Sequence, residues 1–261
     1  MALNSKIAFF QILYKPERNA IINIKKSLEA GFYPIVYLNS VCEELLDEIN
    51  SLNITVLGSN HNVGIGQAFY DVERFLVENE ISYFIYFDQD TIVDSQAWEY
   101  IINTYRDEFK LTKDTGMLFY TSSESAWSRK SIVISSGCLF SLEVVRNLGF
   151  HDKNYFVEGV DYEFCLRLKA QGYSVKVINI PWIDHFSLQP YFKKNFFGMT
   201  FGCRVYGNIR LKDFNNAHVK LFIFTIRNQL YKESLFLLKS FVVFNLSELK
   251  SRFILKLVRG Y

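Results

Sequence analysis

The sequence predicts an α/β protein with a mostly parallel sheet, flanked by helices and followed by a helical C-terminal extension. In its first half, short apolar runs alternate with amphipathic segments of helical length. This alternation is typical of right-handed βαβ units, which build parallel sheets. In addition, residues 83–87 are apolar and aromatic throughout, as expected for a strand that helices cover on both sides.

The individual elements follow from local signals. Pro16 suits the first turn of a helix, and Gly31 suits its end. Strands are expected at residues 7–13, 35–38, 54–57 and 83–87, and helices between Pro16 and Gly31, at 43–52, at 65–78 and from Ser95 to about 109.

The pattern becomes less regular after this helix. Short strands are expected at residues 116–121, 132–136 and 175–178. Between the last two, Val160, Phe164 and Leu168 share one helical face, and Glu163 and Arg167 have the spacing of a supporting ion pair. We therefore expect a helix there.

The chain becomes aromatic and basic near its C-terminus, which predicts two domains, residues 1–190 and residues 191–261. Basic residues in the final segment are interleaved with leucine and phenylalanine: Lys232, Lys239, Lys250, Arg252, Lys256 and Arg259, against Glu233 and Glu248. A basic amphipathic helix of this kind can lie in a membrane interface. The alternative is a helix packed on the catalytic domain with a solvated basic face.

Composition narrows the function. The 261 residues carry a net charge of only +2, which argues against a nucleic-acid binder. Hydrophobic residues make up 49% and aromatic residues 17%, so some apolar surface is expected to meet a membrane or a partner. The four cysteines form no C-x-x-C pair and are expected to be buried, reduced thiols. No stretch has the length of a membrane span, and we expect a cytoplasmic protein.

Two signals follow predicted strands in the first half. Asp88 and Asp90 come directly after the strand at 83–87, where open α/β sheets place their ligands. Carboxylates at this spacing suit Mg²⁺ or Mn²⁺. The alternative is that the two residues belong to an acidic turn exposed to solvent. Upstream, Asn62 and Gly64 lie in a glycine-containing loop that opens into a helix, whose N-terminus favours an anionic or polar ligand.

Two further signals occur in the second half. Gly137 lies among small residues that would leave room for a sugar, or that simply form a tight turn. Glu158 and Asp161 lie at a helix start, where carboxylates are also common for ordinary electrostatic reasons.

Taken in order, these motifs resemble those of the family 2 glycosyltransferases with the Rossmann-like GT-A fold, in particular rhamnosyltransferase-like enzymes of bacterial surface polysaccharides. The resemblance covers residues 6–185. It rests on N-x-G-I-G-x-A from Asn62, F-D-Q-D from Phe87, S-S-G-C-L-F-S from Ser135 and F-V-E-G-V-D-Y-E-F-C-L-R-L-K-A-Q-G-Y from Phe156.

The resemblance implies an inverting, metal-dependent transfer of a sugar from a nucleoside diphosphate. Asp90 would ligate Mg²⁺ or Mn²⁺, with Asp88 contacting the metal shell or the ribose and His185 as a further ligand. Asp161 would be the general base, and Glu158 is its rival. The implied donor-binding residues are Asn39, Asn62, Gly64, Asp88 and Gly137.

The resemblance also implies a glycan or lipid-linked acceptor and a peripheral position at the inner face of the cell membrane. One departure concerns the nucleotide base, because Leu38 stands where related enzymes carry an acid and Asn39 would have to replace its hydrogen bond. Two alternatives remain: a non-catalytic nucleotide-sugar-binding scaffold subunit, and a nucleotidyltransferase. The latter is disfavoured because the loop after the first strand, residues 13–16, contains no glycine.

Overall fold

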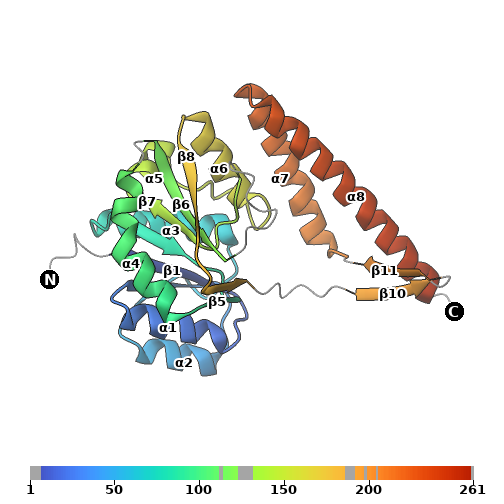
Figure 1. The fold of residues 1–261 in the computed structure, drawn as a ribbon. Coiled ribbons are helices and arrows are strands. Elements are labelled where there is room, and N and C mark those ends of the chain that lie inside the picture. The colour runs from blue at the N-terminus through green and yellow to red at the C-terminus, as the bar shows by residue number, and fades with distance from the viewer. Residues whose placement is uncertain are drawn as a thin grey trace. The chain divides into compact units, whose positions relative to one another are not determined.

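The computed structural model describes residues 7–111, 114–122, 132–185, 192–196, 199–203 and 205–259. The chain forms two compact units (Figure 1). The first consists of Met1–Phe156 and Val160–Phe186, and the second of Val157–Gly159 and Ser187–Tyr261. The second unit therefore includes three residues from the middle of the chain.

The first unit is built on a seven-stranded sheet in the order β3-β2-β1-β4-β7-β6-β8. All neighbouring pairs are parallel except the two that involve β7. The strands are β1 (Ile7–Leu13), β2 (Tyr33–Leu38), β3 (Thr55–Leu57), β4 (Tyr83–Tyr86), β6 (Thr115–Thr121), β7 (Cys138–Ser141) and β8 (Ser174–Asn179). The predicted α/β fold class is confirmed.

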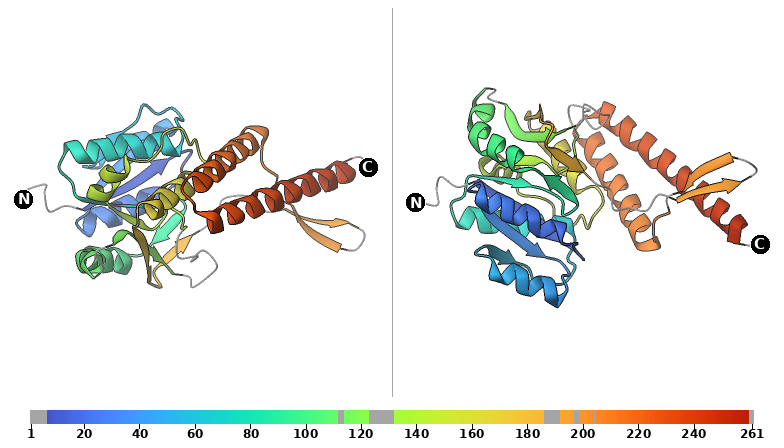
Figure 2. Two further views of the ribbon diagram at one scale, coloured as in Figure 1. Left: turned by 90° about the horizontal axis from the view of Figure 1, so that it is seen from above. Right: turned by 60° about the horizontal axis from the view of Figure 1, so that its bottom comes forward.

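Helices cover both faces of this sheet (Figure 2). Side chains along β1 point alternately to the two faces. Phe9 packs edge-on against Trp98 of α4 (Ser95–Lys110), and the next residue, Phe10, packs edge-on against Phe69 of α3 (Ile65–Glu78). The helices of this unit are α1 (Asn19–Glu29), α2 (Glu43–Ser51), α3 (Ile65–Glu78), α4 (Ser95–Lys110), α5 (Leu142–Leu148) and α6 (Val160–Ala170).

Two expectations from the sequence are wrong. Residues 132–136 do not form a strand; the strand is β7, which begins at Cys138 and runs antiparallel to both neighbours. The reason is visible at Gly137, whose φ of +91° turns the chain just before β7. Of the cysteines whose side chains are described, Cys138 and Cys165 are buried and free, but Cys42 is exposed.

A small second sheet lies directly after the Asp88 motif. Strand β5 (Thr91–Val93) pairs antiparallel with β9 (Ile183–His185), so the backbone of His185 lies opposite that of Thr91. Asn23 of α1 holds β5 in place: its side-chain amide donates to the Thr91 carbonyl, and its side-chain oxygen accepts from the Val93 N–H.

The second unit consists of a β-hairpin and a pair of long helices. Strands β10 (Phe192–Phe196) and β11 (Met199–Cys203) pair antiparallel, which the sequence pattern did not predict. Helices α7 (Asn208–Arg227) and α8 (Tyr231–Arg259) pack together, with Phe214 stacked on Phe244 at 3.8 Å between ring centroids. Among the described residues, none of the helices combines the length and the apolar character needed to cross a membrane.

Candidate active site

Asp88 lies immediately beyond the carboxyl end of β4. The chain leaves the sheet there, so side chains of this segment reach the edge at which parallel sheets bind ligands. The Tyr86 hydroxyl donates to Oδ1 of Asp88 at 2.6 Å. Since Tyr86 is buried in the sheet, it gives the Asp88 carboxylate a fixed anchor.

The Asp161 carboxylate, from the first turn of α6, belongs to the same cluster. The hydroxyl of buried Ser135 donates to its Oδ1 at 2.5 Å. The pKa of the Asp88 carboxyl is raised to about 7, mainly by desolvation. The Tyr86 hydrogen bond opposes this rise, and the charges of Asp161 and Asp90 contribute to it. The electrostatic influence of both neighbours shows that the structure brings three predicted carboxylates together.

Polar side chains that the sequence did not single out fix the backbone of this motif. Ser136 is buried, and its hydroxyl oxygen accepts from the Asp88 N–H at 2.9 Å and lies 2.8 Å from the Thr91 hydroxyl oxygen. Gln89 bonds the backbone of Tyr14 twice, accepting from its N–H and donating to its carbonyl, both at 2.8 Å. The two serines before Gly137 were the only sequence signal for these hydrogen bonds, which we call the frame of the site.

Gly137 has a structural role beside this frame. Its N–H donates to the Tyr86 carbonyl and its carbonyl accepts from the Tyr120 N–H, so it joins two strands of the sheet. A Cβ at this position would lie 2.3 Å from the Tyr120 carbonyl oxygen. The position therefore requires glycine for close backbone packing, whatever it does for a ligand.

The loop containing Asn62 and Gly64 is likewise held by the protein itself. Gly64 has a φ of +87°, and the N–H groups of Ile65 and Gly66 donate to the carbonyls of Phe156 and Tyr155. The first turn of α3 thus already binds backbone carbonyls of the segment before α6.

Asn39 and Asn62 make local contacts in the same loop. The side-chain oxygen of Asn39, which is buried, accepts from the Val63 N–H at 2.7 Å. Asn62 is exposed and accepts from the Gly64 N–H at 3.1 Å. The loop is therefore anchored to the end of β2, close in sequence to Leu38.

Glu158, the rival base, is engaged elsewhere. It belongs to the second unit, where its carboxylate pairs with Arg210 of α7 at 2.7 Å. Asp213, also on α7, accepts from the N–H groups of Val157 and Glu158 at 3.0 and 2.9 Å. The Glu158 carboxylate is therefore already occupied by an arginine, and we keep Asp161 as the first candidate for the base.

Comparisons with known proteins show what the whole chain is similar to. The dTDP-rhamnosyl transferase RfbF of Shigella flexneri is 27% identical to this chain over 203 residues, which cover 67% of each protein. This similarity supports the resemblance to the family 2 glycosyltransferases that the sequence motifs indicate. A scan of protein-family models found no match.

Solved structures share the fold of this chain. The S. aureus TarS 1-349 complex with UDP matches with a TM-score of 0.55 and 11% identity, over 84% of this chain and 64% of that one. GalNAc-T7 with UDP, GalNAc and Mn²⁺ matches with a TM-score of 0.50 and 10% identity, over 68% and 44%. The chain therefore spans less than two thirds of these structural relatives.

The carboxylates beyond the end of β4 fit a hard divalent cation. Asp88 and Asp90 provide oxygen donors, and their mutual repulsion is of the kind that a cation relieves. Within the part of the chain that the structure describes, no three His, Cys, Asp or Glu side chains form a complete metal cage. Mg²⁺ is commonly bound by one or two carboxylates together with substrate phosphates, so an incomplete protein site is consistent with it. The side chain of His185 lies outside the described residues.

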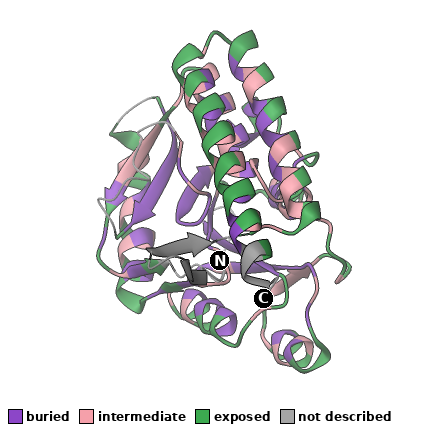
Figure 3. Ribbon diagram, turned by 90° about the vertical axis from the view of Figure 1, so that its right-hand side faces the viewer, coloured by how far each residue is buried: buried purple, intermediate pink, exposed green. Residues whose placement is uncertain are grey.

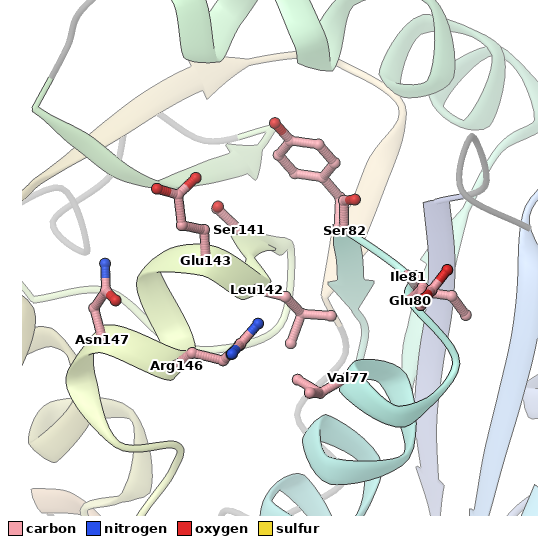
Figure 4. Close-up of a pocket in the computed structure, with 10 residues that line it drawn as sticks. Val77, Glu80, Ile81, Ser82, Ser141, Leu142, Glu143, Arg146 and Asn147 are labelled. Carbon is pink, nitrogen blue, oxygen red and sulfur yellow. The ribbon is translucent and has the colours of Figure 1, made fainter.

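A cavity of about 720 Å³ lies at the opposite end of β4 (Figure 4). It opens beside Tyr83, the first residue of that strand, and includes none of the three carboxylates. Its lining residues are Val77, Glu80, Ile81, Ser82, Tyr83, Ser141, Leu142, Glu143, Arg146 and Asn147. The cavity and the carboxylates thus lie at different ends of β4.

A buried, hydrogen-bonded histidine and glutamate support the helices that carry the site. His151 and Glu73 are fully buried and hydrogen-bonded, and Glu73 also accepts from the His151 N–H at 2.8 Å. The imidazole stacks between Phe69 of α3 and Phe164 of α6, with ring centroids at 4.3 and 4.1 Å. This layer joins α3, which follows the glycine loop, to α6, which carries Asp161.

Proposed function

We propose that this protein is an inverting, metal-dependent glycosyltransferase that moves a sugar from a nucleoside-diphosphate donor to a glycan or lipid-linked acceptor in polysaccharide synthesis. The observation that supports it is the cluster of Asp88, Asp90 and Asp161 beyond the carboxyl end of β4. Asp88 and Asp90 are candidate cation ligands, and Asp161 is held by a different element. Separate roles on the donor and acceptor sides follow from that separation.

On the acceptor side, we assign Asp161 as general base. As the acceptor oxygen forms its bond to the anomeric carbon, the bond from that carbon to the diphosphate oxygen breaks, and the acceptor proton passes to the Asp161 carboxylate. A single displacement of this kind inverts the anomeric centre. Ser135 fixes the orientation of the carboxylate through its hydrogen bond to Oδ1.

On the donor side, Asp90 and Asp88 would hold Mg²⁺ or Mn²⁺, with His185 as a third ligand. The cation, when bound, neutralises the charge of the departing nucleoside diphosphate. The GalNAc-T7 match, which contains Mn²⁺ and UDP, supports the choice of metal. We assign Asn39, Asn62, Gly64 and Gly137 to the walls of the donor site.

The nucleotide and the sugar of the donor are proposed from the names of the matched proteins. The curated relative is named a dTDP-rhamnosyl transferase, which makes dTDP-rhamnose the first donor to test. UDP-sugars come next, because a structural match was solved with UDP.

The decisive experiment mixes purified protein with dTDP-, UDP- and GDP-sugars and measures the released nucleoside diphosphate with Mn²⁺, with Mg²⁺ and with EDTA. Proton NMR of the product reports whether the anomeric configuration has inverted. We expect turnover with one nucleotide class, dependence on the cation and an inverted product. Tight donor binding without turnover, in the presence of extracts that supply acceptors, would favour the scaffold subunit.

We further propose that the reaction takes place at the cytoplasmic face of a membrane, with the protein attached peripherally. The basic and apolar composition of α8 supports this location. Separating membrane and supernatant fractions of expressing cells tests it, and a protein found wholly in the supernatant at low salt contradicts it.

A further inference from the structure

Helix α8 carries two apolar stripes on opposite sides. The inner stripe packs within the second unit: Leu237 is 1% exposed, and Phe244 stacks on Phe214 of α7. The outer stripe is apolar, exposed and repeats every three or four residues: Leu235, Leu238, Val242, Leu246, Leu249 and Phe253. Figure 3 shows how exposed positions recur along the two long helices. A helix with a single buried face would carry polar residues there.

The outer stripe is long and strongly exposed. From Leu235 to Phe253 it extends about 27 Å, at the usual helical rise. Leu235 is 69% exposed and Phe253 is 63% exposed. Contiguous apolar surface of this extent on a protein marks an interaction site.

Helix α7 contributes to the same face. Val219, Ile223 and Ile226 are also exposed and have helical spacing. A small apolar groove of about 140 Å³ joins the two helices, and both Val219 of α7 and Leu238 of α8 line it. The two exposed stripes therefore border one groove and form one surface, which we call the outer face of the α7–α8 pair.

The charge around this face is strongly positive. Between residues 208 and 259 the sequence has ten basic residues and three acids. Two of those acids are engaged: Asp213 accepts backbone N–H groups, and Glu248 is buried and pairs with Arg252 at 2.9 Å. The basic residues are Arg210, Lys212, Lys220, Arg227, Lys232, Lys239, Lys250, Arg252, Lys256 and Arg259.

The lysines lie on one flank of the outer stripe of α8. Lys232, Lys239 and Lys250 are separated by seven and eleven residues, close to whole numbers of helical turns, so they line up along the helix. A stripe that paired with a second copy would carry charges of both signs on its flanks. Lysines alone would repel each other across such an interface, whereas they complement anionic lipid headgroups.

We propose that the outer face of the α7–α8 pair docks on an anionic lipid bilayer, with its leucine, valine and phenylalanine side chains among the acyl chains and Lys232, Lys239 and Lys250 at the headgroups. This assigns a surface to the membrane location proposed above and rests on it. Docking requires no turnover, so it stands or fails separately from sugar transfer.

Vesicle flotation of the full chain tests the proposal. We expect the protein to float with phosphatidylcholine vesicles that contain phosphatidylglycerol, and to remain unbound with phosphatidylcholine alone. Raising the salt concentration should weaken binding without abolishing it, because salt screens the lysines but leaves apolar insertion intact.

Matched variants assign the binding to this face. Leu246→Ser and Phe253→Ser should each weaken vesicle binding about tenfold, because each removes one inserted side chain. Leu111→Ser, at a residue of the first unit that is 68% exposed, is the control and should bind like the wild type. Circular dichroism and a thermal melt confirm that the variants fold, as expected for exposed positions.

Three outcomes overturn the inference. The wild-type protein could stay off anionic vesicles at low salt, or Leu246→Ser and Phe253→Ser could float as well as the wild type. Sedimentation could also show a dimer that these two substitutions dissociate, which would make the outer face a contact between copies. Sugar transfer to a soluble acceptor is measured in parallel. A protein that transfers sugar but does not bind vesicles contradicts only the docking proposal, and one that binds vesicles but does not transfer sugar contradicts only the proposed activity.

Discussion

The hydroxyl of Ser135 lies 2.5 Å from Oδ1 of Asp161 and donates a hydrogen bond to it. Ser135 precedes β7 and Asp161 begins α6, so this contact ties the candidate base to the edge of the sheet. The candidate base is thus positioned by a residue that itself has no acid–base role in the proposed reaction.

We expect Ser135→Ala to lower kcat about tenfold, since hydrogen bonds to charged groups contribute about 1.5–3 kcal/mol. The KM for the donor should change little, because the effect is on the acceptor side. Kinetics at varied donor and acceptor concentrations check this split. A variant that loses donor affinity and stability instead would show that Ser135 only supports the fold.

Asp90→Asn should abolish transfer and remove the stabilisation that Mn²⁺ gives in the presence of nucleotide. An amide is a weaker ligand than a carboxylate for a hard cation, and the variant keeps the size of the side chain. Thermal shift with and without Mn²⁺ and nucleotide measures the ligand effect separately from activity. Full wild-type turnover in EDTA would contradict the metal proposal.

Asp161→Asn should reduce kcat by several orders of magnitude and leave donor binding nearly unchanged, because a general base acts in the transition state. Glu158→Gln is the matched comparison. The Glu158 carboxylate is paired with Arg210 of α7. We therefore expect a smaller loss of kcat in Glu158→Gln, caused only by the weaker contact with α7. A larger loss of kcat in Glu158→Gln than in Asp161→Asn would transfer the role of base to Glu158.

Gly137→Ala should destabilise the protein by roughly 2–4 kcal/mol, because its Cβ would meet the Tyr120 carbonyl oxygen and its φ is +91°. Gly172→Ala is the control: its φ is +83°, but nothing lies within 4 Å of its Cβ. It should cost only about 1–2 kcal/mol of backbone strain. Urea unfolding gives both free energies, and equal losses would rule out the clash.

His218 predicts a pH dependence within the α7–α8 pair. Burial lowers its pKa from the ordinary 6.5, so the folded state favours the neutral ring, which stacks on Phe214. The resulting stability is complete above pH 6.5 and decreases as the pH falls through that value. The protection factors of amides in α7, which correct for the intrinsic pH dependence of exchange, should therefore fall below about pH 6. His218→Leu should remove that dependence, and an unchanged pH profile in this variant would contradict the assignment.

Periodicity predicted most elements of the first unit because their ends carry local signals. The helix expected at residues 65–78 is α3 with the same bounds, and the strand at 7–13 is β1. Strand direction is not encoded in periodicity, so the antiparallel β7 was not predicted. Residues 132–136 resembled a strand because they begin with three β-branched apolar residues. In the structure, Ser135 and Ser136 of this segment instead form hydrogen bonds with Asp161 and Asp88.

The charged residues of the candidate site could be predicted from the sequence, but the side chains that hold its backbone in place could not. Asp88, Asp90 and Asp161 stand out because acids interrupt apolar segments. Gln89 and Ser136 act through the backbone of residues distant in the sequence, Tyr14 and Asp88, and no local pattern reveals such a bond. Glycines gave a partly misleading signal, because the close approach at Gly64 and Gly66 is made by the protein's own backbone.

The membership of residues 157–159 in the second unit makes the two units interleaved along the chain. A chain shortened to end at residue 186 would lose Asp213 and Arg210, leaving two amides and one carboxylate without their partners just before Asp161. Likewise, a chimera that exchanges the C-terminal helices with a relative must carry residues 157–159 along with them. The unit that contains α7 and α8 is thus exchanged only together with three residues next to the candidate base.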